Sequence, residues 1–223
     1  MKIRTEGKCI IGCKEKYTPG KGSAHLLKCE GVLQSLRSQK KLEEGYLVRI
    51  SWAEEPNMYW MMVAVANSLT LSDLDQFLRD EWLECCGHLS EFTIGGRRYM
   101  SHTKSGNPSQ SMKKQVGQVF SPGLELEYVY DMGSSTELML QVLEAFQSCP
   151  QKKVTMLMQN DPPPFSCEIC EKQPEIICSL CGETTCNRCS KKHSCALQEE
   201  DTYMLMPLVN SPRVGVCGYE GKV

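Results

Sequence analysis

The sequence CEICEKQPEIICSLCGETTCNRCSKKHSC, residues 167–195, decides the fold of the carboxy-terminal part of the chain. It contains seven cysteines and one histidine, and six of the cysteines form three Cys-x2-Cys pairs. The tight turn within such a pair lets both sulfurs reach one ion, and eight thiolate or imidazole ligands fill two tetrahedral Zn²⁺ sites. We therefore predict two zinc ions here, held by Cys167, Cys170, Cys178, Cys181, Cys186, Cys189, His193 and Cys195.

These eight ligands can be shared between the two ions in two ways. In an interleaved arrangement, one ion is held by Cys167, Cys170, Cys186 and Cys189, and the other by Cys178, Cys181, His193 and Cys195. A sequential arrangement would place the first four cysteines on one ion. We favour the interleaved form because crossing ligands let so short a segment build one shared core. The spacing resembles that of MYND-, HIT- and B-box-like modules, which mostly bind proteins; alternatively, zinc only replaces a hydrophobic core that so small a piece lacks.

Disulfide bonds are the other use of so many cysteines, and they require an oxidising compartment. The opening residues MKIRTEGK lack the apolar segment of a secretory signal. The apolar run MYWMMVAVA, residues 58–66, is too short to cross a bilayer. We therefore expect zinc thiolates in a cytoplasmic protein that has no membrane role.

A second cysteine-rich segment, CIIGCKEKYTPGKGSAHLLKC, covers residues 9–29. Its Cys9 and Cys13 are separated by three residues, as are His25 and Cys29. We predict a helix over residues 23–36 with Ser23 as its N-cap. Such a helix would place His25 and Cys29 on one face. The pattern indicates a Cys3His zinc finger, which brings the expected number of zinc ions to three.

The net charge of −2 excludes a globally basic nucleic-acid-binding protein, but the charge is unevenly distributed. Residues 1–45 hold ten basic and five acidic side chains, whereas residues 165–200 hold four basic and six acidic ones. A basic segment of this kind favours phosphate contact, and an aromatic ring could stack on a base. The predicted nucleic-acid-binding residues are Lys14, Lys16, Tyr17, Lys21 and Lys28; the alternative is a solvated charged face.

The middle of the chain predicts an α+β fold, with a central, mostly antiparallel sheet and one main helix. Apolar residues recur at helical spacing within residues 69–89, where Ser72 and Asp75 suggest a weak capping box, and Gly95-Gly96 predicts a β-hairpin. Further strands are expected at residues 45–52, 57–66, 124–131, 136–146 and 152–160. The predicted domains are an amino-terminal finger (1–40), an α+β core (41–160) and a double-zinc module whose tail packs back (161–223).

Two other groups of side chains allow an enzymatic alternative. Cys85 and Cys86 with His88 could form a nucleophile and its base, but Cys85 falls on the apolar stripe of the predicted helix, so we favour a buried structural thiol. Asp131, with Glu137 and His102, could bind a metal or perform acid–base chemistry. Cys149 and Cys217 are left over, and Cys217 could replace Cys195 as a ligand.

Two stretches of the middle region, TLSDLDQFLRDEWLECCGHLSEFTIGGRRY (70–99) and LEYVYDMGSSTELMLQV (126–142), resemble the Ri-plasmid open-reading-frame-three-like family. Members of that family are also known as passenger proteins of insertion elements. The flanking fingers and the tail PLVNSPRVGVCGY (207–219) look like a zinc-binding subgroup of it. Where the family's second motif has Trp and His, this chain has Thr136 and Leu138. The resemblance implies an α+β fold and an association with mobile DNA, without a role that depends on the missing His.

Together these observations predict a non-enzymatic zinc-binding adaptor or regulatory protein of mobile-element type. We expect the amino-terminal finger to bind DNA or RNA and the carboxy-terminal module to bind a protein partner. The alternatives are a protein-interaction module without nucleic acid, or an enzyme that depends on cysteine and histidine.

Overall fold

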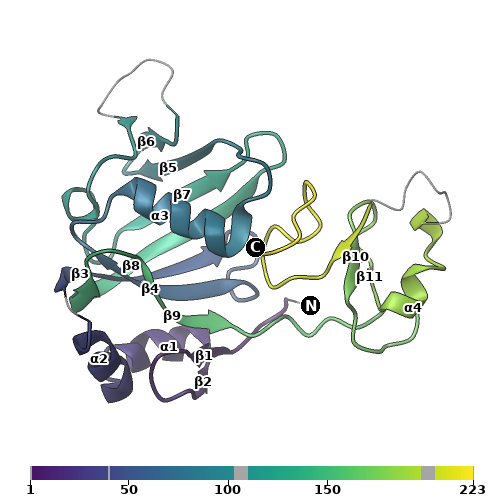
Figure 1. Cartoon of the computed structure of the whole chain (residues 1–223), viewed down its shortest axis with the longest axis horizontal. Helices are drawn as coiled ribbons and strands as arrows, with labels where there is room; N and C mark the ends of the chain where they lie inside the picture. Colours follow the sequence, from purple (N-terminus) through teal and green to yellow (C-terminus); the bar gives the residue numbers. More distant parts are fainter. Residues whose placement is uncertain (1, 40, 103–109, 197–203, 223) are drawn as a thin grey trace.

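The computed structural model describes residues 2–39, 41–102, 110–196 and 204–222. Its centre is a nine-stranded antiparallel sheet in the order β2-β1-β9-β4-β3-β8-β7-β5-β6 (Figure 1). The strands are β1 (Gly7–Cys9), β2 (Lys16–Tyr17), β3 (Leu42–Trp52), β4 (Trp60–Ala66), β5 (Ser90–Ile94), β6 (Arg97–Met100), β7 (Glu125–Tyr130), β8 (Thr136–Pro150) and β9 (Thr155–Asn160). The predicted mixed fold, mostly sheet with few helices, is confirmed.

The centre of the sheet is its most apolar part. Every residue of β4, WMMVAVA, is buried, as in a strand whose two faces are both covered. The predicted hairpin is also present, since β5 and β6 pair from Glu91↔Met100 to Ile94↔Arg97 around Gly95 and Gly96. Both of these glycines have positive φ, which explains why the turn needs them.

One helix lies across a face of the sheet (Figure 1). It is α3 (Leu71–Leu78), which continues as a single π-helical turn, η1 (Arg79–Leu83). The expected cap at Ser72 is wrong: Thr70 is the N-cap, because its hydroxyl accepts from the backbone N–H of Asp73 and the Asp73 carboxylate accepts from the backbone N–H of Thr70. The apolar side of this helix is buried.

The expected single helix over residues 23–36 is wrong. The structure has two short helices instead, α1 (Pro19–Leu26) and α2 (Glu30–Arg37). Cys29 is the extended N-cap of the second helix, and Pro19 starts the first one upstream of Ser23. Strand β1 pairs with β9, so the amino-terminal segment is built into the edge of the main sheet.

The carboxy-terminal module lies to one side of the core in Figure 1. Its strands β10 (Ile176–Cys178), β11 (Thr184–Thr185) and β12 (Leu205–Pro207) form a small sheet in the order β11-β10-β12. The short α4 (Asn187–Ser190) and the 3-10 turn η4 (Ser194–Ala196) complete it. Among the described residues, no helix is both long and apolar enough to cross a membrane.

After β12 the chain returns to the core. The Asn210 side chain exchanges hydrogen bonds with Asn160 at the end of β9. The Ser211 hydroxyl donates to the Trp82 carbonyl at 2.7 Å, under the end of η1. Arg213 is fully buried between the tail and the sheet. The tail therefore links the carboxy-terminal module to the core a second time.

Candidate metal centres

Four groups of cysteine and histidine side chains in the described part of the chain could each hold a metal ion, and in every group the ligand atoms lie within 4.8 Å of one another. A tetrahedral zinc ion would place two sulfurs about 3.8 Å apart, and a sulfur and an imidazole nitrogen about 3.6 Å apart. A disulfide would bring two sulfurs to about 2 Å, and every cysteine in the chain is free. Three of the groups consist of the twelve residues that the sequence singled out.

The first group lies where the amino-terminal hairpin meets the two short helices. Cys9 ends β1, Cys13 follows the turn, His25 lies in α1, and Cys29 precedes α2. The Cys13 sulfur and His25 Nε2 are 3.4 Å apart. Gly12 is required in the turn because a Cβ there would come within 2.8 Å of the Cys9 sulfur and 2.9 Å of the Cys29 sulfur. The four predicted ligands of the amino-terminal finger therefore converge.

The carboxy-terminal module divides its eight ligands in the interleaved way. The groups are Cys167, Cys170, Cys186 and Cys189 on one side, and Cys178, Cys181, His193 and Cys195 on the other. The sulfurs of Cys170 and Cys186 are 3.8 Å apart, and the Cys181 sulfur lies 3.3 Å from His193 Nε2. Both distances are close to those that tetrahedral zinc requires.

The ring of His193 is oriented as in a metal ligand. Its Nδ1 lies 3.3 Å from a carboxylate oxygen of Glu183, while its Nε2 faces the sulfur of Cys181. A histidine that donates one ring N–H to a carboxylate presents the other nitrogen, unprotonated, to a metal. The ring is almost fully buried, so this orientation is fixed by its surroundings.

Ionisation is uneven among neighbouring thiols. Burial opposes ionisation of Cys167, but hydrogen bonds from the backbone N–H groups of Cys186, Ile169 and Cys170 outweigh it and lower the pKa of Cys167 to about 6. Burial and hydrogen bonding to the neighbouring thiols raise the pKa of Cys189 to about 12. Sulfurs this close repel one another as thiolates, so full ionisation of the group requires a cation between them.

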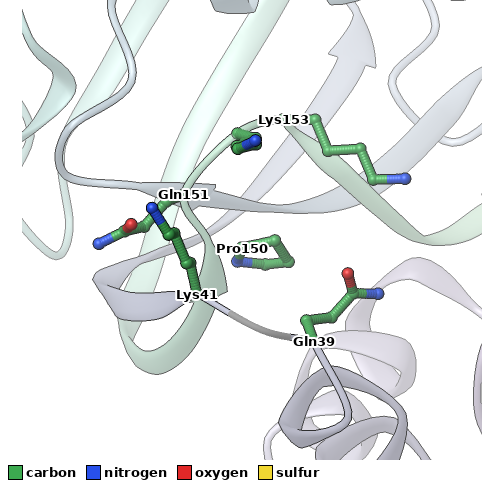
Figure 2. A pocket seen from close by; sticks show the side chains of 6 residues that line it. Gln39, Lys41, Pro150, Gln151 and Lys153 are labelled. Carbon is green, nitrogen blue, oxygen red and sulfur yellow. The ribbon is translucent and has the colours of Figure 1, made fainter.

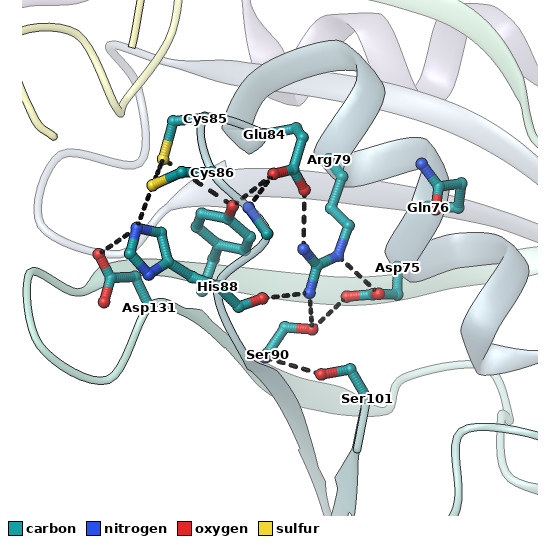
Figure 3. Close-up of polar contacts among 12 residues, drawn as sticks. Asp75, Gln76, Arg79, Glu84, Cys85, Cys86, His88, Ser90, Ser101 and Asp131 are labelled. Atoms are coloured by element: carbon teal, nitrogen blue, oxygen red, sulfur yellow. Dashed lines mark hydrogen bonds and ion pairs between the residues drawn. The ribbon is translucent and has the colours of Figure 1, made fainter. Parts of the chain in front are cut away.

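The fourth group consists of Cys85, Cys86, His88 and Cys217. Figure 3 shows the first three converging beside the end of η1, close to Asp131. Cys85 was expected to be a buried structural thiol; it packs against the main core but is only partly buried, and its sulfur lies 3.6 Å from that of Cys86. Cys217 does not replace Cys195; it contacts Cys86 instead, 131 positions earlier in the chain. Because the two residues are so far apart in the sequence, no local spacing pattern could predict that they meet.

Asp131 does not join Glu137 and His102 in any metal-binding group of the described residues. Its carboxylate accepts hydrogen bonds from the Gly133 backbone N–H at 2.9 Å and from Arg213 Nη2 at 2.8 Å. Burial opposes ionisation of Asp131, but these hydrogen bonds outweigh it and lower its pKa to about 2. Asp131 is therefore an ion-pair partner of the tail.

The predicted nucleic-acid-binding residues differ in their surroundings. Lys14, Lys21 and Lys28 are exposed. Lys16 forms an ion pair with Asp161 at 2.5 Å, and the ring of Tyr17 stacks on His25 with centroids 4.1 Å apart. The Lys14 ammonium, although exposed, donates to the Ile10 backbone carbonyl. Three of the five residues thus already have partners within the chain.

A second basic surface lies at the far end of β8. A pocket of about 450 Å³ there is lined by Gln39, Lys41, Pro150, Gln151, Lys152 and Lys153. Figure 2 shows the side chains that surround it. These lining residues include no cysteine, histidine or carboxylate, so they offer positive charge but none of the usual metal ligands.

The fold and these groups define a class of protein: a mostly β core with cysteine-rich ends whose Cys and His groups could each hold a metal ion. Residues 44–176 match the family described as "Plasmid pRiA4b ORF-3-like protein", and the chain belongs to this family. The match covers the core and ends within the carboxy-terminal module, so most of the metal-binding candidates lie outside it.

Among solved structures, a protein of unknown function from Methanosarcina mazei Go1 is similar, with 19% identity and a TM-score of 0.41. The similarity covers 48% of this chain and 63% of that one, so this chain spans under two thirds of that protein. No curated protein matches the chain significantly.

Proposed function

We propose that the protein is a non-enzymatic, zinc-binding adaptor or regulatory protein of mobile-element type, from a zinc-binding subgroup of its family, and that it acts in the cytoplasm. The observation that carries this proposal is that four protein ligands converge in each of the three predicted groups. A catalytic zinc ion keeps one position open for water or substrate, whereas a structural zinc ion has four protein ligands. The zinc ions would then hold surfaces in shape, and the function would lie on those surfaces.

The surface proposed for a protein partner lies on the carboxy-terminal module. Ile169 and Leu180 each sit inside a Cys-x2-Cys turn, and their side chains are 53% and 57% exposed. Contiguous exposed apolar patches mark protein-binding surfaces, and we propose that these two side chains belong to one such patch. The acidic charge of residues 165–200 favours a partner with an apolar patch and a basic rim.

The surface proposed for nucleic acid is the amino-terminal finger. Lys14, Lys21 and Lys28 are exposed on a segment with excess positive charge, and no acidic side chain of the described residues lies within ion-pair distance of any of them. Lys16 and Tyr17 contribute less in this proposal because Lys16 is paired with the carboxylate of Asp161 and one face of the Tyr17 ring is stacked on His25. Phosphate contact by three lysines predicts binding that weakens steeply as salt increases.

A gel shift with single-stranded and double-stranded DNA and RNA tests the nucleic-acid half. We expect the variant K14E/K21E/K28E to bind at least tenfold more weakly than wild type at low salt, with a salt slope reduced by about three. The matched control is K41E/K152E/K153E, which makes the same change of charge at the pocket of Figure 2 and is expected to bind like wild type.

Equal weakening in both variants would mean that only the overall charge matters. Absence of binding by wild type would remove the nucleic-acid half and leave a protein-interaction module.

A second candidate function, a thiol enzyme, is favoured by one distance, the 2.9 Å between the Cys86 sulfur and His88 Nε2. Hydrogen bonding to Cys85 and burial, however, raise the pKa of Cys86 to about 12, which disfavours a reactive thiolate.

A further inference from the structure

We infer that Cys85, Cys86, His88 and Cys217 bind a fourth zinc ion, which fastens the carboxy-terminal tail to the core. The Cys86 sulfur lies 3.6 Å from that of Cys85 and 3.7 Å from that of Cys217. His88 Nε2 lies 3.3 Å from the Cys217 sulfur. These separations match the spacing in the other three groups and in tetrahedral zinc sites. Only the 2.9 Å between Cys86 and His88 is short, so the imidazole would move slightly on binding.

The backbone on both sides is bent so that the ligands meet. Gly87, between two of the ligands, has φ of +73°, and Gly218, after the last one, has φ of +69°. Cys217 itself has φ of +51°, a left-handed conformation that is strained for a non-glycine residue. A bond from its sulfur to a metal would offset this strain. Without one, the tail has a strained residue and a half-exposed cluster of thiols with no evident benefit.

The surroundings also suit a bound thiolate. Arg213 Nη2 donates to the Cys85 sulfur at 3.5 Å, and the Tyr130 hydroxyl lies 3.9 Å from the same sulfur. Charge-assisted hydrogen bonds of this kind stabilise the thiolates of metal sites and orient them. Arg213 belongs to the same tail as Cys217, so the tail supplies both a ligand and a donor to a ligand of the core.

Two alternatives fit less well. A disulfide would need sulfurs about 2 Å apart, and none of the pairs approaches this distance. A nucleophile–base pair of Cys86 and His88 gives no reason for two further thiols, one of them from a distant segment. The competing metal-free arrangement is an imidazolium at His88 paired with Asp131, whose carboxylate oxygen lies 3.5 Å from Nε2. The experiment below separates it from a zinc site.

Native mass spectrometry of the full-length, zinc-loaded protein counts the ions directly. We expect four zinc ions per chain in wild type and three in C217S and in H88A. H88C keeps four soft ligands and is expected to retain the fourth ion, whereas an imidazolium paired with Asp131 could not be replaced by a thiol. The control C149S changes a buried cysteine that belongs to none of the groups, and it is expected to keep four ions.

Hydrogen exchange gives a second readout that a folding defect would not imitate. In C217S and H88A, residues 208–222 should exchange faster than in wild type and H88C, while β3 and β4 remain equally protected. Three ions in wild type, or four in C217S, would overturn the inference. The proposed function fails separately, if C13S, C170S and C181S leave the zinc count unchanged.

Discussion

Arg213 is a buried cation of the tail, and its guanidinium donates its hydrogen bonds to residues of the core. Its guanidinium donates to Asp131 at 2.8 Å and to the Thr136 hydroxyl at 3.1 Å, and it lies 4.7 Å from the centroid of the Tyr130 ring. Thr136, the first residue of β8, is a small, buried polar side chain that accepts this hydrogen bond. A buried charge is tolerated only when it is paired and hydrogen-bonded, and Asp131 provides the pair.

The variant R213M tests this ion pair. Methionine has a similar length but no charge, so Asp131 would be left buried and uncompensated. We expect a loss of about 3 kcal/mol in the free energy of unfolding, measured by urea denaturation of the zinc-loaded protein. The double variant R213M/D131N should recover part of the loss because it removes the unpaired charge. An unchanged urea midpoint in R213M would show that the ion pair does not stabilise the tail.

The same residues show why some ligands could be predicted from sequence and others could not. Cys-x2-Cys spacing is a local signal, since a tight turn alone brings the two sulfurs together. Cys217 and Arg213 meet their partners only through the fold: Arg213 pairs with Asp131, 82 positions earlier, and Cys217 meets His88, 129 positions earlier. The sequence therefore located three groups in full. For the fourth it placed Cys85, Cys86 and His88 together but left Cys217 apart.

At the scale of elements, local turn chemistry was the dependable guide. Gly95-Gly96 predicted the hairpin because both positions need positive φ. The helix over 23–36 was predicted as one element because it would place His25 and Cys29, four residues apart, on one face, yet Cys29 is extended. Its sulfur belongs to the amino-terminal group, and this tertiary constraint overrides the local helical pattern.

Strand packing gives a prediction at the same scale. Gly45 lies at a register irregularity of β3, and a Cβ there would come within 2.1 Å of the Val65 carbonyl oxygen and 2.7 Å of the Ala66 Cα. G45A should therefore force β3 and β4 apart and lower the free energy of unfolding by about 2 kcal/mol. The control is G20A. Gly20 lies in α1, and a Cβ added there would meet no neighbouring atom within 4 Å, so this variant should be neutral or slightly stabilising. Equal urea midpoints for G45A and wild type would contradict this explanation.

At the scale of the whole molecule, the two cysteine-rich ends differ in what supports them. The amino-terminal finger contributes Cys9, Leu26, Cys29, Val32 and Leu36 to the main hydrophobic core. In the carboxy-terminal module, the buried apolar cluster of the described residues consists of cysteines alone, namely Cys167, Cys186 and Cys189 with Cys170 packed against them. The first end shares a core with the sheet, whereas the buried cluster of the second is made of candidate metal ligands.

Metal removal should therefore act unequally on the two ends. Structural zinc contributes on the order of 10 kcal/mol to the folding of modules that lack a core of their own. After chelation, we expect amides of residues 167–195 to lose their protection from hydrogen exchange, while β3 and β4 keep theirs. Strand β1 should lose less than the carboxy-terminal module because it stays hydrogen-bonded to β9. If residues 167–195 kept their protection after complete removal of metal, cysteine packing alone would hold the module, and zinc would not be its structural element.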